Sequence, residues 1–176
     1  MKGSKKIILE WVRMVLIALV ISFFIRTYVA EARWVPTESM APTIKAGDHL
    51  MTEKIAFKIK GIERGDIVVF TPPEKVNVEN EDFVKRVIGL PGETIYIKDG
   101  VVYINDQPLN EPYILEKPKR DFYPFTIPDN CVFVMGDNRN NSYDSRYWGA
   151  LPIENIIGRV VVLYYPLKDA KLFIND

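Results

Sequence analysis

The chain has 176 residues with 23 basic and 23 acidic side chains, so its formal net charge is zero. This length fits one domain, or one domain with an insertion, and is enough to bury a substantial core. No segment carries a basic stripe, which argues against a nucleic-acid partner. The single cysteine, Cys131, excludes an internal disulfide and a cysteine-based metal cluster, and we expect it to be a buried strand residue.

Residues 7–25 form an apolar segment whose only charges are Glu10 and Arg13. As a helix this segment would be about 28 Å long, close to the roughly 30 Å hydrocarbon core of a bilayer. Lysines precede it in residues 1–6, so the positive-inside rule predicts a cytoplasmic N-terminus and an exported remainder. We therefore expect a cytoplasmic tail over residues 1–6, a transmembrane anchor over 7–28 and an exported domain over 29–176.

Two alternatives to a retained anchor stay open. A cleaved secretory signal has a short apolar core and a small-residue exit site, which Ala30-Glu31-Ala32 imitates. A buried helix of a soluble protein is the other alternative, but residues 16–21 show no polar face. The sequence favours a single span that is retained.

After the anchor the pattern is typical of β-structure. Short apolar or alternating runs, divided by Gly and Pro, predict strands at residues 49–51, 66–70, 83–88, 95–97, 101–104, 131–135 and 157–165. Asp99-Gly100 predicts a hairpin with positive φ at both central residues. We interpret residues 93–129 as an inserted, β-rich subdomain with a structural role, and residues 72–82 as an acidic, solvated loop. No helix longer than two turns is expected beyond Tyr28.

Ser39 lies in a Pro-flanked loop just outside the anchor. A serine needs a base to become a nucleophile, and nothing in the sequence around His49, the only histidine, marks it as one. A lysine can supply the base instead, because burial lowers its pKa from about 10.4 by several units. Lys85 stands in the predicted strand 83–88, and strand alternation places Lys85 and Val87 on one face. The alternatives are a turn hydroxyl for Ser39 and an exposed strand lysine for Lys85.

A third polar element covers residues 136–149, which are rich in Asp, Asn, Ser and Arg. Its spacing does not fit an EF-hand calcium loop, because no acidic residue stands at the closing position. Asp144 and Arg146 can form an ion pair that fixes the loop. Ser142 or Ser145 could hydrogen-bond an uncharged lysine and orient it. We expect no metal site and no cofactor.

Four motifs in order resemble those of the bacterial type I signal peptidases, Ser/Lys proteases that remove signal peptides from exported proteins. The resemblance covers the anchor and nearly all of the exported part. The motifs are Pro36-Thr37-Glu38-Ser39-Met40-Ala41-Pro42-Thr43-Ile44, Gly65-Asp66-Ile67-Val68-Val69-Phe70, Lys85-Arg86-Val87-Ile88-Gly89-Leu90-Pro91-Gly92-Glu93, and Gly136-Asp137-Asn138 with Ser142, Asp144, Ser145 and Arg146. The resemblance implies a mainly β, signal-peptidase/LexA-like fold with a β-rich insert, preceded by one transmembrane helix that is kept.

The resemblance also implies a role for each matching residue. Ser39 would be the acylating nucleophile and Lys85 the general base. Ser142 would orient the Lys85 amine, and the Thr37 hydroxyl would complete an oxyanion hole with the Ser39 N–H. The others would support the site or line a pocket for a small side chain: Asp144 and Arg146 for support, and Pro36, Met40, Ile44 and Phe83 for the pocket. Glu38 departs from the family pattern, which has a small residue there, and we expect its carboxylate to face solvent.

The implied partners are preprotein signal peptides and the lipid bilayer, and the oligomeric state stays open. Two other functions are compatible with parts of the sequence. One is a self-cleaving Ser/Lys repressor-type protease, against which the apolar span and the lack of a DNA-binding helix pair argue. The other is a non-catalytic, membrane-tethered β module that binds peptides. Loss of cleavage on replacing Lys85 would separate an enzyme from such a module.

Overall fold

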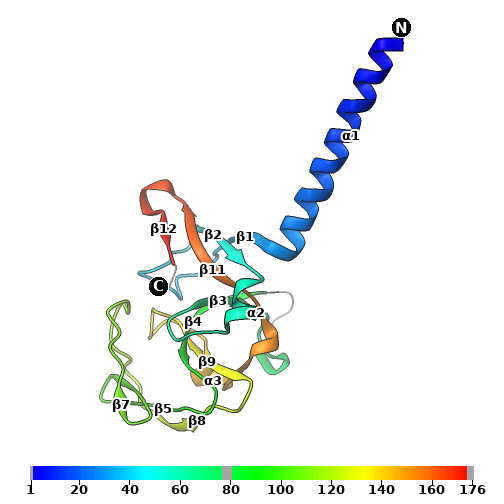
Figure 1. Cartoon of the computed structure of the whole chain (residues 1–176). Helices are drawn as coiled ribbons and strands as arrows, with labels where there is room; N and C mark the ends of the chain where they lie inside the picture. Colours follow the sequence, from blue (N-terminus) through cyan, green and yellow to red (C-terminus); the bar gives the residue numbers. More distant parts are fainter. Residues whose placement is uncertain (1, 77–80, 174–176) are drawn as a thin grey trace.

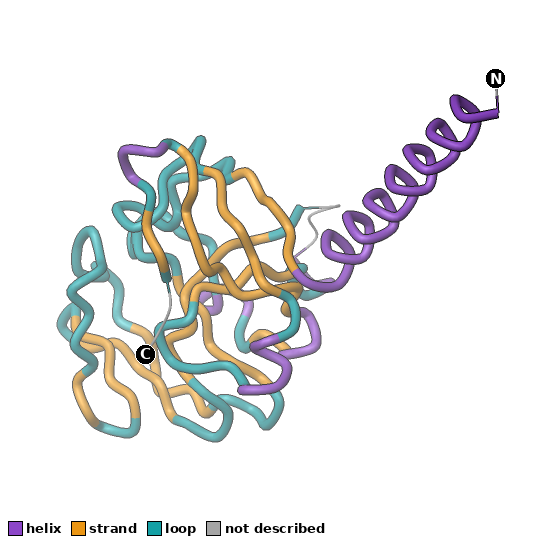
Figure 2. Tube along the Cα trace, turned by 45° about the horizontal axis from the view of Figure 1, so that its top comes forward, coloured by secondary structure: helices purple, strands orange, loops and turns teal. Residues whose placement is uncertain are grey.

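The computed structural model describes residues 2–76 and 81–173. Its N-terminal part is one long helix, α1 (Lys2–Phe24), which continues as a π-helical turn, η1 (Ile25–Val29). Figures 1 and 2 show α1 standing away from the strands. Within the described residues one stretch, Ile7–Val29, is long and apolar enough to cross a membrane, with a mean hydropathy of 2.3 and no buried residue. The expected N-terminal apolar helix is therefore confirmed, and the helix begins five residues before the predicted span.

The rest of the chain is mainly β, as expected from the sequence. In the described residues, eight antiparallel strands form a large sheet in the order β1-β2-β11-β3-β4-β9-β10, with β12 paired to β11. These strands are β1 (Ala30–Trp34), β2 (His49–Glu53), β3 (Ile67–Phe70), β4 (Phe83–Gly89), β9 (Cys131–Met135), β10 (Leu151–Pro152), β11 (Ile156–Tyr165) and β12 (Lys171–Leu172). Register shifts in β11 at Val160/Val162 and Leu163/Tyr165 are irregularities of the bulge type, which bend a strand and increase its twist.

The large sheet is buried on both faces at its central strands β3 and β4, which explains the continuous apolar run of β3. All four residues of β3 are buried, and they alternate between two core clusters. Val68 and Phe70 pack into one cluster with Trp148 and Leu151. Ile67 and Val69 pack into the other, on the opposite face. A polar side chain at the centre of this sheet is therefore removed from water.

The insert forms a smaller sheet in the order β7-β6-β5-β8, seen at the bottom left of Figure 1. Its strands are β5 (Thr94–Lys98), β6 (Val101–Ile104), β7 (Gln107–Pro108) and β8 (Phe122–Thr126). The predicted hairpin is confirmed, since Asp99 and Gly100 have φ of 51° and 74°. Buried residues from this sheet pack on Ile88, Phe133 and Met135 of the large sheet.

Helices outside α1 are short, as predicted. They are α2 (Ala56–Lys60), α3 (Ser145–Trp148) and the 3-10 turns η2 (Glu74–Val76), η3 (Ile153–Asn155) and η4 (Leu167–Asp169). Two details differ from the expectations. Cys131 is in a strand but only partly buried. The acidic loop at 72–82 is not simply solvated, because Val76 is buried in a core cluster; residues 77–80 lie outside the described part.

Candidate active site

The large sheet brings a serine and a lysine into direct contact. Lys85 is the third residue of β4, an interior strand between β3 and β9, and only 5% of it is exposed. Ser39 lies in the turns that follow β1 and is 9% exposed. The Lys85 Nζ donates to Ser39 Oγ at 2.7 Å and to the Val84 carbonyl oxygen at 3.0 Å. The separation of Nζ and Oγ is within the reach that proton transfer needs.

The surroundings of Lys85 favour its neutral form. Burial lowers the pKa of the Lys85 amine from 10.5 to about 8. The Asp144 carboxylate opposes this shift, the Arg146 guanidinium adds to it, and the Asp137 carboxylate opposes it more weakly. About a tenth of the amine is therefore unprotonated at pH 7, against a far smaller fraction for an exposed lysine, and this neutral form can accept a proton from the adjacent hydroxyl.

Backbone contacts hold the serine loop against the loop that follows β9. The Ser39 carbonyl accepts from the Asn138 N–H at 3.1 Å, and the Glu38 carbonyl accepts from Asn138 Nδ2 at 3.2 Å. A Cβ on Gly136 would stand 2.3 Å from the Ser39 carbonyl oxygen and 2.4 Å from Ser142 Oγ. Only glycine allows this approach, so Gly136 fixes how closely the two loops pack.

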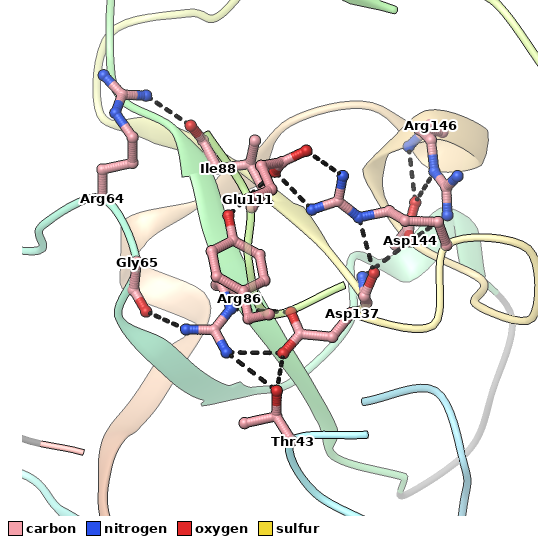
Figure 3. Close-up of polar contacts among 12 residues, drawn as sticks. Thr43, Arg64, Gly65, Arg86, Ile88, Glu111, Asp137, Asp144 and Arg146 are labelled. Atoms are coloured by element: carbon pink, nitrogen blue, oxygen red, sulfur yellow. Dashed lines mark hydrogen bonds and ion pairs between the residues drawn. The ribbon is translucent and has the colours of Figure 1, made fainter. Parts of the chain in front are cut away.

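The remaining polar residues of the site lie in the loop after β9. The Asp144 carboxylate is fully buried, caps α3, accepts from the Gly136 N–H at 3.0 Å and pairs with Arg146 at 2.8 Å. Figure 3 shows this pair at the start of α3. Ser142 Oγ is buried and has no hydrogen-bond partner among residues 2–76 and 81–173, so the structure does not contain the expected bond to Lys85. The Thr37 hydroxyl lies 3.2 Å from Ser39 Oγ.

A groove of about 590 Å³ opens onto the Ser39–Lys85 pair. Pro36, Met40 and Phe83 line it, together with Thr37. Ile44 is not among the lining residues, and its side chain is fully buried in a core cluster that also contains Met40. The structure therefore places Ile44 in the core rather than in the pocket that the sequence resemblance implied.

His49 lies away from the groove, whereas Glu38 lines it beside Ser39. His49 packs against Tyr164 and Tyr165, with ring centroids 5.8 and 5.4 Å apart, and is not among the groove residues. The Glu38 side chain is exposed, as expected, and its Oε1 accepts from the Ala46 N–H at 3.3 Å. In the described part of the chain, no group of three or more His, Cys, Asp or Glu side chains could hold a metal ion.

An ion-pair network behind the site was not predicted. Arg86, the neighbour of Lys85, binds Asp137 through two bonds of 2.8 and 2.6 Å, and Thr43 donates to the same carboxylate at 2.6 Å (Figure 3). Since β4 is buried on both faces, strand alternation alone would have placed Arg86 in a second buried environment that requires a carboxylate partner.

The wall of the groove also contains an unexpected pair. Arg33 of β1 binds Asp82, at the end of the loop that the sequence analysis treated as solvated. Both residues line the groove and both side chains are 27% exposed. This pair therefore joins the two sides of the groove.

Comparison with known proteins gives a consistent family. The family model described as "Signal peptidase, peptidase S26" matches residues 8–165. The chain is similar to signal peptidase I of Leptolyngbya laminosa (47% identical, covering 92% of this chain and 81% of the relative) and to signal peptidase I S of Bacillus subtilis strain 168 (36%, covering 96% and 95%). It is also similar to the chloroplastic thylakoidal processing peptidase 1 of Arabidopsis thaliana (38%), of which it covers 46% while 85% of this chain is matched.

Among solved structures, a signal peptidase I from Enterococcus faecalis V583 is 33% identical; the match covers 56% of this chain and 95% of that one, with a TM-score of 0.49. The family model spans most of the chain, and the bacterial relatives are matched over most of their own length. The chain is therefore a peptidase and belongs to the signal peptidase family, peptidase S26.

Proposed function

We propose that this protein is a membrane-anchored endopeptidase that cleaves N-terminal signal peptides from exported preproteins through a Ser39/Lys85 dyad. One observation carries the proposal: in a member of the signal peptidase family, a buried lysine amine lies 2.7 Å from a serine hydroxyl. A direct lysine–serine contact without histidine needs a lysine that is neutral at working pH. Burial in the large sheet supports that, since it lowers the Lys85 pKa to about 8.

The proposed reaction begins with proton transfer from Ser39 Oγ to the neutral Lys85 amine. Oγ attacks the carbonyl carbon of the scissile peptide bond, and a tetrahedral oxyanion forms. When it collapses, the C–N bond breaks, the lysine ammonium returns a proton to the leaving amine, and the signal peptide remains as an ester on Ser39. Lys85 then takes a proton from water, whose oxygen attacks the ester carbonyl. When this second intermediate collapses, the bond between the carbonyl carbon and Ser39 Oγ breaks, the lysine ammonium returns the proton to Oγ, and the signal peptide leaves as its carboxylic acid.

Two further residues are proposed to assist this chemistry. The Thr37 hydroxyl is close to Ser39 Oγ and could donate to the developing oxyanion together with the Ser39 N–H. Ser142 would orient the Lys85 amine. Its Oγ is buried and has no other partner in the described chain, so it is available for that bond. The Asp144–Arg146 pair would support the site by holding the Gly136 N–H and the start of α3.

The groove suggests how a signal peptide would bind. An extended peptide could lie between residues 33–40 on one side and residues 81–85 on the other, adding a strand that aligns its carbonyl with Ser39. Pro36, Met40 and Phe83 would close on the side chain before the cut and admit only a small one. Main-chain bonding would give affinity for many preproteins, and the pocket would give selectivity.

The N-terminal helix would hold the enzyme where its substrates emerge. Its length and composition suit a membrane span. The lysines before it favour a cytoplasmic N-terminus, with residues 1–6 as a tail, 7–28 as the anchor and 29–176 as the extracytoplasmic catalytic domain. A signal peptide in the same bilayer then meets the groove by diffusion in two dimensions.

The test is processing of a preprotein by the full-length protein in detergent or liposomes. Ser39→Ala should abolish cleavage, because it removes the nucleophile. Lys85→Met should lower the cleavage rate by a factor on the order of 10²–10⁴, the contribution of a general base. Lys98→Met, which replaces an exposed strand lysine of the insert, is the matched control and should cleave normally. Unchanged cleavage by folded Lys85→Met would exclude Lys85 as the base. If the unaltered chain cleaves no preprotein, the alternative of a non-catalytic module that binds peptides is favoured.

A further inference from the structure

The segment that returns from the insert sheet reaches the back of the active site. Residues 111–115 follow β7 and run along the loop after β9, where Gly136 and Asp137 lie. Three alternate residues of this segment make contact: Glu111 with Arg139, Tyr113 with Arg86, and the Leu115 N–H with the Asp137 carbonyl at 3.2 Å. Residues 111–114 form a turn in which the Ile114 N–H donates to the Glu111 carbonyl at 3.4 Å, so these contacts come from one short bend of the chain.

The first contact connects Glu111, through Arg139, to Gly136, which packs against the Ser39 carbonyl. Glu111 binds the Arg139 guanidinium through two bonds of 2.7 Å, and neither side chain is more than 5% exposed. Arg139 Nε in turn donates to the Gly136 carbonyl at 3.1 Å. Gly136 is the residue packed against the Ser39 carbonyl, so the carboxylate of the insert acts on the nucleophile loop through Arg139 and Gly136.

The second contact acts on the segments that carry the base and the nucleophile. The Tyr113 ring lies 4.0 Å from the Arg86 guanidinium carbon, a cation–π geometry, and its hydroxyl donates to Glu111 at 3.0 Å. Arg86 adjoins Lys85 and binds Asp137 by two bonds, and Thr43 of the serine loop donates to the same carboxylate. One aromatic ring thus covers the junction of β4, the serine loop and the loop after β9.

We propose that residues 111–115 of the insert are a positioning element for the dyad, with Glu111 and Tyr113 as positioning residues that act through Arg139 and Arg86. The inference rests on the proposed function, and it gives the insert a role in positioning the dyad in addition to its structural role. Glu111 and Tyr113 touch neither Ser39 nor Lys85 and do not line the groove. Their effect is therefore on the geometry of the dyad and not on substrate affinity.

The physical basis is that these buried charges have fixed partners. A buried guanidinium that loses its carboxylate is left with an unpaired charge, and the other carboxylate that acts on Arg139 is that of Asp137. Pairing of Arg139 with Asp137 would loosen Asp137 from Arg86 and Thr43 and shift the serine loop. A displacement of about 1 Å between reacting groups can cost on the order of 10²-fold in rate.

The experiment measures acylation of Ser39 in the full-length protein by an activated ester that releases a chromophore in a burst, alongside kcat and KM on a signal-peptide substrate. The amplitude of the burst counts competent sites, and its rate reports their geometry. Glu111→Gln and Tyr113→Leu should each slow the burst about 10- to 100-fold at full amplitude. They should lower kcat by a similar factor and leave KM within about twofold.

Matched controls separate positioning from general stability. Tyr113→Phe keeps the ring over Arg86 and should recover most of the rate, while Tyr123→Leu makes the same substitution at a residue of β8 that is 91% exposed and should have no effect. If Glu111→Gln does not fold, Tyr113→Leu and Tyr113→Phe still decide the question. A reduced amplitude at the normal rate, a change confined to KM, or equal rates for Tyr113→Leu and the unaltered chain would overturn the inference.

The same measurements distinguish failure of the inference from failure of the proposed function. If the unaltered chain gives no burst and no cleavage, the Ser39/Lys85 proposal itself fails. If it gives both and the variants match it, only the positioning role is lost.

Discussion

The two sheets of this protein bury different kinds of side chain. The large sheet encloses Lys85 and Arg86 in its interior strand β4, where they are 5% and 8% exposed. In the insert sheet, the buried residues of β5 and β6 are the aliphatic Ile95, Ile97, Val102 and Ile104. A charged residue is tolerated inside the large sheet because partners from other segments surround it. The burial that lowers the pKa of a lysine is thus found in the large sheet, whereas β5 and β6 of the insert sheet bury aliphatic side chains.

The largest effect outside the Ser39–Lys85 pair is expected for Thr37→Val, at a groove residue in the loop that follows β1. This substitution keeps the shape of the side chain and removes the hydroxyl near Ser39 Oγ. Loss of an oxyanion donor should lower kcat by about 10²–10³ and change KM little. The measurement is steady-state cleavage of a signal-peptide substrate, with Thr126→Val in the insert sheet as the control. If the substitution changes only KM, Thr37 does not donate a hydrogen bond to the oxyanion.

The next largest effect is expected for Gly136→Ala, which should lower kcat by about 10²-fold. Its Cβ would overlap the Ser39 carbonyl oxygen at 2.3 Å and force the serine loop away from Lys85. Gly158→Ala is a suitable control, because its Cβ would stand 2.7 Å from the Glu53 carbonyl at a place in the large sheet that does not line the groove. Both variants should lose stability, and only the first should lose activity per folded molecule. Equal specific activities would contradict this role for Gly136.

The burial of Lys85 should also appear in stability. Its pKa is about 8 in the folded protein and near 10.5 when exposed, so between these values the unfolded chain binds more protons and stability rises with pH. The rise should total about 3 kcal/mol, since one pKa unit corresponds to about 1.4 kcal/mol. Denaturant unfolding of the full-length protein and of Lys85→Met, compared from pH 7.5 to 11, isolates this contribution. Identical pH dependence of the two proteins would indicate an exposed amine.

The smallest effect concerns Ile44, which the structure places in the core. Ile44→Val should cost about 0.5–1.5 kcal/mol of unfolding free energy and leave the preference for a small side chain before the cut unchanged. Met40→Ala, at a residue that does line the groove, should broaden that preference. Cleavage of peptides with Ala or Val at this position compares the two. If Ile44→Val also accepts larger side chains at this position, Ile44 does contribute to the pocket.

The sequence could predict what depends on local pattern. Alternating apolar runs located β2 to β6, β9 and β11 but not β1, β7, β8, β10 or β12, Asp99-Gly100 located the hairpin, and the order of motifs linked Ser39 and Lys85 in one hypothesis. The ion pairs could not be predicted in this way, because they join segments far apart in the chain. Asp82 looked solvated since its partner Arg33 lies 49 positions earlier.

The errors have physical reasons as well. Ile44 was assigned to the pocket by the resemblance alone, and its side chain is buried in the core cluster that also contains Met40. The role proposed for Glu111 and Tyr113 depends on where the insert's return segment packs, which no spacing in the sequence encodes. Local periodicity specifies elements, and tertiary packing decides which charges meet.

The most direct test is titration of the Lys85 amine itself. NMR of the full-length protein in detergent, with isotope-labelled lysine and Lys85→Met to assign the signal, follows the ε-carbon through the pH range. The titration should have a midpoint at about pH 8, matching the pH at which Ser39 acylation reaches half its maximum. A midpoint near 10.5 in a protein that still cleaves its substrate would show that the lysine is solvated and charged, and that another group activates the serine.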